Sequence, residues 1–309
     1  MIGGTQSGQT PEVQLPELLA PYREILEATL RPTIWIHTDQ SGRGEVGQSR
    51  VSGTPDLPSS VTWPKFGDHY LDYLLQINLA ELPANSGTPP LPSTGMLWLF
   101  EGWNAPDGCQ QLTMYVGDEP LIPSELLVES YYSDTVEPHT LRFRAGFDIP
   151  HWFSDAQEQL EEQLIAAVSA DRSVKPDRTS EEIRADGRDV ADEVDTALRS
   201  TRSQLAAGAF AKLFGWTGGI GHNIHERAFM WRDHPGLEDP YNGPATVDTN
   251  GRSSWRNLLT VDSDDVLGLY IGDAGYTAVL IHEDDLQRQD FSACYVTQES
   301  SSPQGETGR

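Results

Sequence analysis

One histidine-containing segment is the first candidate for metal chemistry. In His222-Asn-Ile-His225-Glu226, two imidazoles stand three residues apart with a carboxylate beside them, so both can share one helix face. The order differs from His-Glu-x-x-His, which joins two metal ligands to a general base. The glycine-rich stretch 215–221 before it favours a loop, in which these would be ordinary polar side chains of a turn. His222, His225 and Glu226 are therefore weighed as metal ligands against that simpler interpretation.

A second group of candidates is acidic. Asp262-Ser-Asp-Asp265 follows an apolar strand pattern, and Asp273 follows another. Clustered carboxylates can bind cations, but a calcium loop needs more oxygen ligands at alternating positions. Asp and Ser also bond to their own backbone in turns. Asp262 and Asp273 are candidate ligand-binding residues, with turn formation as the alternative.

Three tryptophans are expected in loops and are candidates for a binding surface. Trp63, Trp103 and Trp216 each combine a large apolar ring with a polar N–H, as residues that contact a peptide or sugar often do. The alternative is that these rings pack beneath the loops that carry them.

Familiar catalytic signatures are absent from the sequence. The stretch 215–221 is rich in glycine but lacks the lysine and the spacing of a phosphate-binding loop, and no Gly-x-Ser-x-Gly occurs. A triad assembled from distant residues stays possible, because its members meet only in the folded chain. No cofactor is expected.

The charge of the chain restricts its partners. With 47 Asp and Glu against 21 Lys and Arg, the formal net charge is −26. Such a surface repels nucleic acids and anionic membranes, and it attracts basic proteins or cations. Solubility is the simpler reason for so many acids. The sequence shows neither a signal peptide nor a long apolar segment, so we expect a cytoplasmic protein.

Two distant passages look like versions of one unit. Residues 73–81 and then 95–100 give an apolar strand, a polar turn and a second apolar strand, and residues 255–265 and then 267–275 repeat this order. Many prolines and glycines accompany this pattern. The sequence predicts an α+β fold that is internally duplicated, with mostly antiparallel β-sheets, a few helices and a helical connector.

Changes in pattern along the chain predict its organisation. We expect a disordered N-terminus (1–14), a first β-rich half (15–150), an acidic helical connector (151–210), a second β-rich half (211–298) and a disordered tail (299–309). Ser154 with Gln157 has the pattern of a capping box at the start of the connector. In the second half, strands are expected at 257–261, 268–272, 276–282 and 293–297.

The order of several short blocks resembles the YwqG-like family of bacterial proteins of unknown function. The blocks are Arg50-Val-Ser-Gly-Thr-Pro-Asp-Leu-Pro58, Trp63-Pro64, Leu74-Leu-Gln-Ile-Asn78, residues 95–100, residues 255–265, Gly272-Asp-Ala-Gly275 and Glu283-Asp-Asp-Leu286. The resemblance covers about residues 45 to 298 and implies a duplicated α+β fold without an established reaction. The chain departs from it at Thr260, where the family usually carries glutamine.

These observations favour a cytoplasmic binding or interaction protein that is not an enzyme. One form of this hypothesis is an immunity-type protein that neutralises a basic partner through charge complementarity. The alternative is an enzyme or a small-ligand or metal-binding protein that uses the cleft between the two halves. His222, His225, Glu226 and Asp262 would be its first candidate residues. The oligomeric state stays open.

Overall fold

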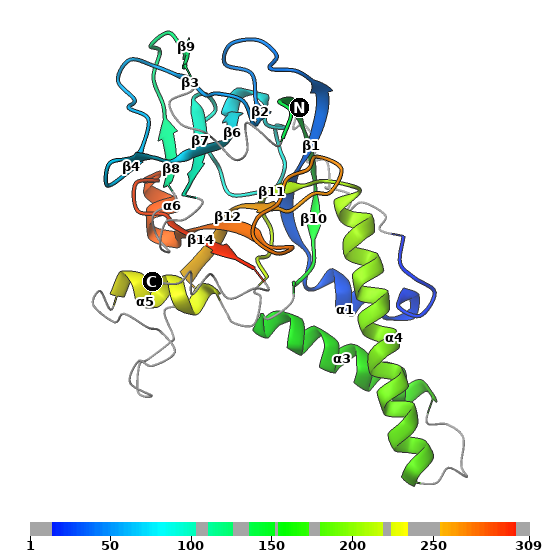
Figure 1. Cartoon of the computed structure of the whole chain (residues 1–309). Helices are drawn as coiled ribbons and strands as arrows, with labels where there is room; N and C mark the ends of the chain where they lie inside the picture. The colour runs from blue at the N-terminus through cyan, green and yellow to red at the C-terminus, as the bar shows by residue number, and fades with distance from the viewer. Residues whose placement is uncertain are drawn as a thin grey trace, which may run out of the picture.

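The fold is described from a computed structural model (Figure 1). The structure describes residues 14–102, 111–125, 136–151, 154–172, 180–218, 224–233 and 254–300. Within these ranges, no helix combines the length and apolar character needed to cross a membrane.

A ten-stranded antiparallel sheet organises the molecule, which confirms the prediction of a mostly antiparallel, sheet-rich α+β fold. Its strand order is β14-β13-β12-β11-β1-β10-β2-β6-β7-β8. The strands are β1 (Arg31–Ser41), β2 (Arg50–Val51), β6 (Asp72–Asn78), β7 (Met96–Glu101), β8 (Gln111–Tyr115), β10 (His139–Asp148), β11 (Ala211–Phe214), β12 (Trp255–Asp262), β13 (Tyr276–His282) and β14 (Tyr295–Glu299). Two small two-stranded sheets lie outside it and pair β3 (Asp56–Leu57) with β9 (Ile122–Pro123) and β4 (Lys65–Phe66) with β5 (His69–Tyr70).

The sheet has the same arrangement on both sides of its central pair, β1 and β10. On one side β2, β6, β7 and β8 follow in chain order, and on the other side β11, β12, β13 and β14 do the same. Arg50 of β2 pairs with Gln76, and Lys212 of β11 pairs with Thr260. The register of β6 against β7 shifts at Leu74, and that of β12 against β13 shifts at Leu258.

The sheet curves so that its two sides share one core. Apolar side chains of both sides form a single cluster, among them Leu97 and Leu99 of β7 with Val279 and Ile281 of β13. Polar contacts join the same regions. The fully buried carboxylate of Glu101 accepts hydrogen bonds from Thr277 Oγ1 and, at 3.1 Å, from Gln298 Nε2. Strands that stand far apart in the sheet order are thereby held together.

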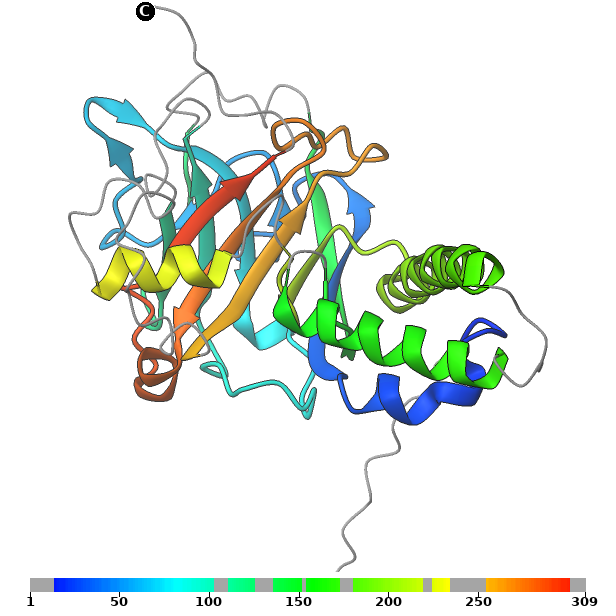
Figure 2. The ribbon, with the colours of Figure 1, turned by 90° about the horizontal axis from the view of Figure 1, so that it is seen from below.

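Different elements cover the outer faces of the two sides. Helix α5 (Ile224–Asp233) packs over β12 to β14 through a cluster that includes Phe229, Trp255 and Leu280 (Figure 2). On the other side, Trp63 and Leu57 pack on Trp98 of β7. The short helices η2 (Leu79–Glu81) and α6 (Glu283–Arg288) follow β6 and β13 respectively.

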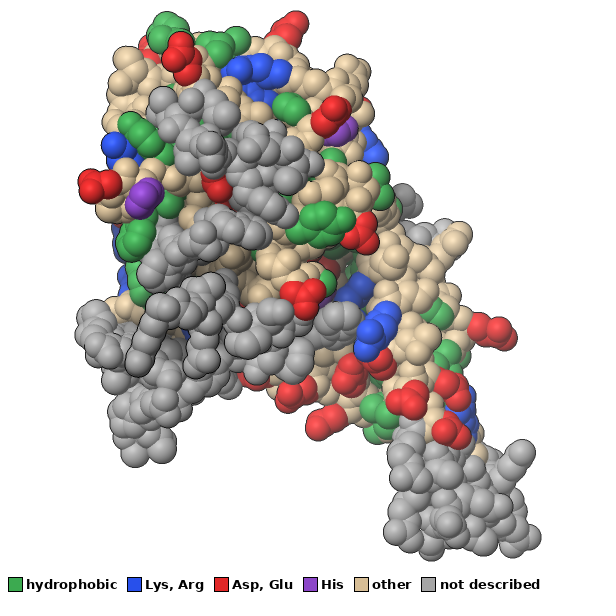
Figure 3. Space-filling model, viewed as in Figure 1, with side chains coloured by type: hydrophobic (Ala, Val, Ile, Leu, Met, Phe, Trp, Pro, Cys, Tyr) green, Lys and Arg blue, Asp and Glu red, His purple; other side chains and the backbone are tan. Residues whose placement is uncertain are grey.

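Three helices form a helical arm, defined as α1 (Arg23–Glu27), α3 (Asp155–Arg172) and α4 (Ser180–Ala206), which extends from the sheet (Figures 1 and 2). The predicted capping contact is present, since Gln157 N donates to Ser154 Oγ over 3.2 Å. The arm has its own apolar cluster, in which Leu164 of α3 packs with Val194 of α4. Acidic side chains gather on its surface (Figure 3).

One predicted strand is absent from the structure, and the apolar residues from Leu15 to Leu26, which recur at helical spacing, form only short helices. Residues 268–272 are a turn and not a strand, because Gly268 and Gly272 have positive φ and only the bridge Asp264–Leu269 forms. The apolar periodicity from Leu15 to Leu26 ends in only a 3-10 turn, η1 (Ala20–Tyr22), and α1. Pro21 lacks the backbone donor that a longer helix would use there.

Candidate functional site

The acidic cavity is the site that best combines space with chemical groups. It encloses about 510 Å³ beside the turn between β12 and β13. Its lining residues are His151, Asp262, Ser263, Asp265, Tyr270, Gly272, Asp273, Ala274, Gly275 and Tyr276. Both acidic residues singled out by sequence, Asp262 and Asp273, therefore line the same cavity.

The loop that carries the acids is held in shape by its own hydrogen bonds. Ser263 Oγ donates to Gly275 O over 2.8 Å and accepts from Ile271 N over 2.9 Å. Asp264 Oδ1 accepts from Leu267 N over 2.8 Å. A Cβ at Gly275 would lie 2.0 Å from Glu299 O, so only glycine permits this approach. The loop 263–275 presents its carboxylates from a defined backbone.

A buried ion pair supports the cavity from behind. Lys212 Nζ lies 2.6 Å from Asp148 Oδ2, and both side chains are nearly inaccessible. The same oxygen accepts from Trp216 N over 2.8 Å. The ammonium group also lies 5.5 Å from the centre of the Trp35 ring. Since burying an unpaired charge is costly, this pair fixes the ends of β10 and β11 relative to each other.

Asp262 is an acidic residue of the cavity whose acid–base behaviour is altered. Asp262 is exposed to water at the cavity, although neighbouring segments of the chain partly desolvate its carboxylate. This desolvation raises its pKa to about 6, the Lys212 ammonium opposes the rise, and the Asp148 and Asp264 carboxylates add to it. Asp262 is therefore mostly ionised at neutral pH and becomes neutral in mildly acidic solution.

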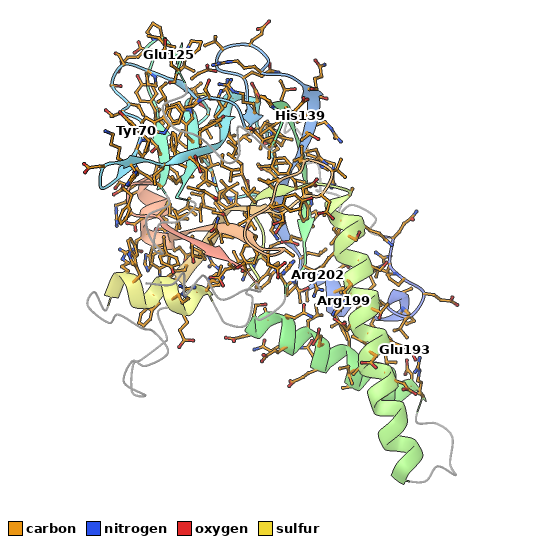
Figure 4. The ribbon with its side chains drawn as sticks, viewed as in Figure 1. Tyr70, Glu125, His139, Glu193, Arg199 and Arg202 are labelled. Carbon is orange, nitrogen blue, oxygen red and sulfur yellow. The ribbon has the colours of Figure 1, made fainter. Side chains whose placement is uncertain are left out.

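His151 contributes a neutral imidazole to the cavity wall. Burial, with the positive charges of Lys212 and Arg202, lowers its pKa to about 3. Arg202 lies at the end of α4 nearest the sheet, whereas Glu193 and Arg199 lie farther out along the arm (Figure 4). Because His151 stays uncharged at neutral pH, the cavity keeps a negative character.

The backbone at Gly218, in the segment after β11, contacts two residues of the cavity wall, His151 and Tyr276. Tyr276 Oη donates to Gly218 O over 2.6 Å. A Cβ at Gly218 would lie 2.3 Å from His151 Nδ1, so glycine permits the contact between this segment and the imidazole. Burial raises the pKa of Tyr276 above its usual range, and its hydroxyl stays protonated. His151 and Tyr276 are thus neutral groups of the cavity wall, and the aspartates at the rim carry the charge.

The histidine segment does not contribute to this cavity. His225 lies on α5, where its Nε2 is 2.7 Å from Thr217 Oγ1, and burial with the charges of Arg31 and Arg256 lowers its pKa to about 4. Glu226 is half-buried on the same helix. His222 lies outside the described residues, so the proposed trio stays a prediction. Where the structure describes side chains, no group of three or more potential metal ligands occurs.

The three tryptophan candidates have separate environments. Trp63 is buried among the rings of Tyr70 and Phe100, and its Nε1 donates to Leu71 O over 2.7 Å, so it packs beneath its loop. Trp216 is half-buried and stacks with Arg31. Trp103 lies outside the described residues.

Sequence reasoning missed His151, Tyr270 and the pair of Lys212 with Asp148. One signal was available for the pair. Lys212 interrupts the apolar run from Phe210 to Phe214, where a charged residue requires a buried partner. Asp148 ends the alternating strand that contains Leu141 and Phe147, but nothing local indicates that the two meet.

Comparison with known proteins gives a family without a reaction. The family described as a domain of unknown function, DUF1963, matches residues 49–299. No curated protein matches the chain. All residues of the acidic cavity fall within the matched range, which covers most of the sequence. The chain therefore belongs to the DUF1963 family.

Proposed function

We propose that this protein binds a basic partner protein and that the acidic cavity receives a Lys or Arg side chain of that partner. The supporting observation is that Asp262, Asp265 and Asp273 converge on one cavity of about 510 Å³. Carboxylates around a concave surface concentrate the negative potential of the molecule. The positively charged head group of a lysine or arginine is complementary in charge to these three acids.

The surroundings of the cavity suit contact with a protein surface. Tyr270 lines the cavity with its ring 43% exposed, and Val266 at the tip of the same loop is 97% exposed. Apolar contact next to carboxylates suits the aliphatic stem and charged end of a long basic side chain. Aromatic residues are also enriched at protein interfaces. The net charge of −26 would accelerate association with a basic partner.

Two variants that change the net charge by the same amount test the proposal. The triple variant Asp262→Asn, Asp265→Asn, Asp273→Asn removes the rim charges. The control Asp39→Asn, Asp68→Asn, Asp118→Asn makes the same charge change at exposed positions outside the cavity lining. Binding of a fluorescent deca-arginine peptide is followed by anisotropy at several salt concentrations, with deca-glutamate as the negative probe.

We expect the cavity variant to bind deca-arginine about tenfold more weakly, and the control to lose about twofold, because rim charges are individually weak but act together on one site. Equal losses in the two variants would show that net charge alone attracts the peptide. That result would overturn the proposal for the cavity.

The immunity-type role is a narrower form of the same proposal. It requires that a toxic basic protein encoded beside this chain is neutralised on co-expression and that the cavity variant loses this protection. Protection by the cavity variant equal to that of the wild type would count against the narrower form.

A small-ligand binder or enzyme is the second candidate, favoured by the pKa of Asp262. A carboxylate with a pKa of about 6 can exchange protons near neutral pH, as acid–base catalysts do. Native mass spectrometry and metal analysis of the purified protein separate the candidates. A bound small molecule or stoichiometric zinc or iron would favour this second function.

The matching strand orders, paired registers and register shifts support the proposal that the two sides arose by duplication. The YwqG-like assignment and a cytoplasmic location stay proposals that rest on the sequence.

A further inference from the structure

A second, smaller pocket has the opposite charge. We call it the arginine pocket and define it by its lining residues Arg31, Pro32, Pro89, Phe214, Gly215, Arg256 and Asn257. It encloses about 190 Å³. Phe214 ends β11, whereas Ala211, which begins this strand, pairs with Val261 beside Asp262. The two sites thus lie toward opposite ends of one strand.

Arg31 is held in the pocket by an aromatic stack. Its guanidinium carbon lies 3.2 Å from the centre of the Trp216 ring. That ring is anchored, because Trp216 Nε1 donates to Thr29 O over 2.9 Å and its backbone N donates to Asp148 over 2.8 Å. Stacking leaves the edge of a guanidinium free to donate hydrogen bonds in its plane.

The positive charge of Arg31 lacks a close acidic partner. Across the described part of the chain, no carboxylate oxygen lies within 4 Å of its guanidinium nitrogens, although eleven other basic side chains there make such contacts. Arg144 and Arg202 are also half-buried without a close carboxylate, but they donate hydrogen bonds to Leu205 O and Pro150 O, whereas the Arg31 guanidinium donates to no acceptor among the described residues. An anion from solution would supply the missing partner.

A second arginine faces the same space. Arg256 of β12 lines the pocket, and its nearest carboxylate is Glu283 at 3.2 Å, in a pair whose side chains are 35% and 44% exposed. Burial lowers the pKa of Arg31 to about 10, the charge of Arg256 contributes, and the carboxylate of Asp148, the residue opposite Arg31 on β10, opposes the change. Two guanidinium groups that repel each other across a small space gain from a bridging anion.

Apart from Asn257, the remaining wall is formed by apolar residues and glycine, and its backbone conformation is unusual. Pro32 and Pro89 line it without backbone donors of their own. Phe214 has φ +61° and Gly215 has φ +77°, so two successive residues adopt the left-handed conformation. For a bulky residue such as Phe214 this conformation is costly and persists only where surrounding structure enforces it. Strained backbone of this kind is common at binding sites.

We propose that the arginine pocket binds a small oxyanion, held between the guanidinium groups of Arg31 and Arg256. The volume is below the roughly 300 Å³ of ordinary small-molecule pockets, so it suits a phosphate or carboxylate group and not a large metabolite. Arginine pairs with either group through two parallel hydrogen bonds. The site is independent of the acidic cavity and of its proposed partner.

Titration with defined anions tests the site. Inorganic phosphate, acetate and chloride are titrated into the full chain at constant ionic strength, and binding is followed by calorimetry and by the thermal midpoint. We expect saturable one-to-one binding of phosphate or acetate and none of chloride. The phosphate and acetate arms distinguish a tetrahedral from a planar ligand.

Variants locate the binding. Arg31→Gln and Arg256→Gln should each weaken binding about tenfold, because each removes charge-assisted hydrogen bonds. Arg142→Gln, which removes an exposed arginine outside the pocket lining, should leave binding within about twofold of wild type by the same reasoning. If Arg31→Gln fails to fold, Arg256→Gln decides the matter. Equal effects of phosphate and chloride, or equal losses in Arg142→Gln and Arg256→Gln, would overturn the proposal.

Discussion

Two equivalent positions of the sheet carry a buried basic residue, but their surroundings differ. Arg50 of β2 pairs with Gln76, and Lys212 of β11 pairs with Thr260. Around Arg50 the polar side chains form a buried network with one another. Its Nη1 lies 2.7 Å from Asp56 Oδ2, both side chains are fully buried, and Gln76 Nε2 donates to the same carboxylate over 3.1 Å.

Lys212 is also buried in an ion pair, with Asp148, but the polar residues next to it on β12 differ from those on β6. Thr260 is shorter than glutamine and donates to Asn257 Oδ1 over 3.0 Å, so it does not reach toward an acid. The residue two positions later differs as well. Asn78 donates to Gly47 O over 2.9 Å and accepts from Ala80 N over 3.0 Å, whereas Asp262 faces the acidic cavity.

The comparison separates structural from functional polar groups. The glutamine that the resemblance led us to expect at Thr260 is present at Gln76, where it completes a buried network. Its replacement by threonine coincides with a carboxylate open to water. We therefore interpret the Arg50 side as a rigid brace and the Lys212 side as the part of the sheet adapted for binding.

The largest expected effect concerns the brace. Arg50→Met should destabilise the fold by about 3–5 kcal/mol, because it leaves Asp56 as a buried carboxylate without its main partner. At present hydrogen bonds from Arg50 and from Gly47 N outweigh burial and lower the pKa of Asp56 to about 2. Urea denaturation at neutral pH measures the loss, with the exposed Arg142→Met as control. A loss below about 1 kcal/mol would contradict a bracing role, since that is the scale of an exposed pair.

An intermediate loss of stability is expected when Asn78 is replaced by aspartate, the residue found at the corresponding position 262. Asn78→Asp replaces an amide donor, now 2.9 Å from Gly47 O, with a carboxylate that repels this oxygen. We expect a loss of about 1–3 kcal/mol, the range for an unsatisfied buried polar group. The reciprocal change Asp262→Asn should not destabilise the protein at pH 7. If both variants lose similar stability in parallel denaturation curves, the two positions do not differ in the way proposed.

The smallest expected effect is a pH dependence of stability that comes from Asp262. The pKa of Asp262 is about 6 in the folded state, above the ordinary value of 3.8, so folding favours its protonated form. Asp262 therefore opposes stability above about pH 6, and this penalty disappears as the pH falls from 6 toward 3.8. Asp262→Asn should be slightly more stable than wild type at pH 7.5, and the difference should vanish by pH 4. A difference in thermal midpoint that stays constant over this range would refute the assignment.

Local patterns predicted much of the fold. The strand predicted at Tyr276–His282 has the observed bounds, because a short apolar run rich in β-branched residues is typical of a buried strand. The start of the helical connector was also indicated, by Ser154 with Gln157. The turn at 268–272 was mistaken for a strand because its apolar residues are buried for a different reason. Leu269 and Ile271 fill the core from a loop.

The site was only partly accessible to sequence reasoning. Asp262 and Asp273 were recognised as acids after strands, and they do meet in one cavity. His151 and Asp148 come from a segment more than a hundred residues earlier, and their contribution depends on the pairing of β1 with both β10 and β11. Such proximity depends on the topology of the sheet, which a linear pattern does not contain.

The buried carboxylate of Glu101 limits how this molecule can move. Because it accepts hydrogen bonds from Thr277 and Gln298, swinging the outer strands apart would leave a buried carboxyl group without these two partners. A clamshell motion of the kind that two-lobed receptors use would thus be energetically unfavourable. Recognition should proceed as docking between nearly rigid surfaces, with adjustments confined to side chains such as Tyr270.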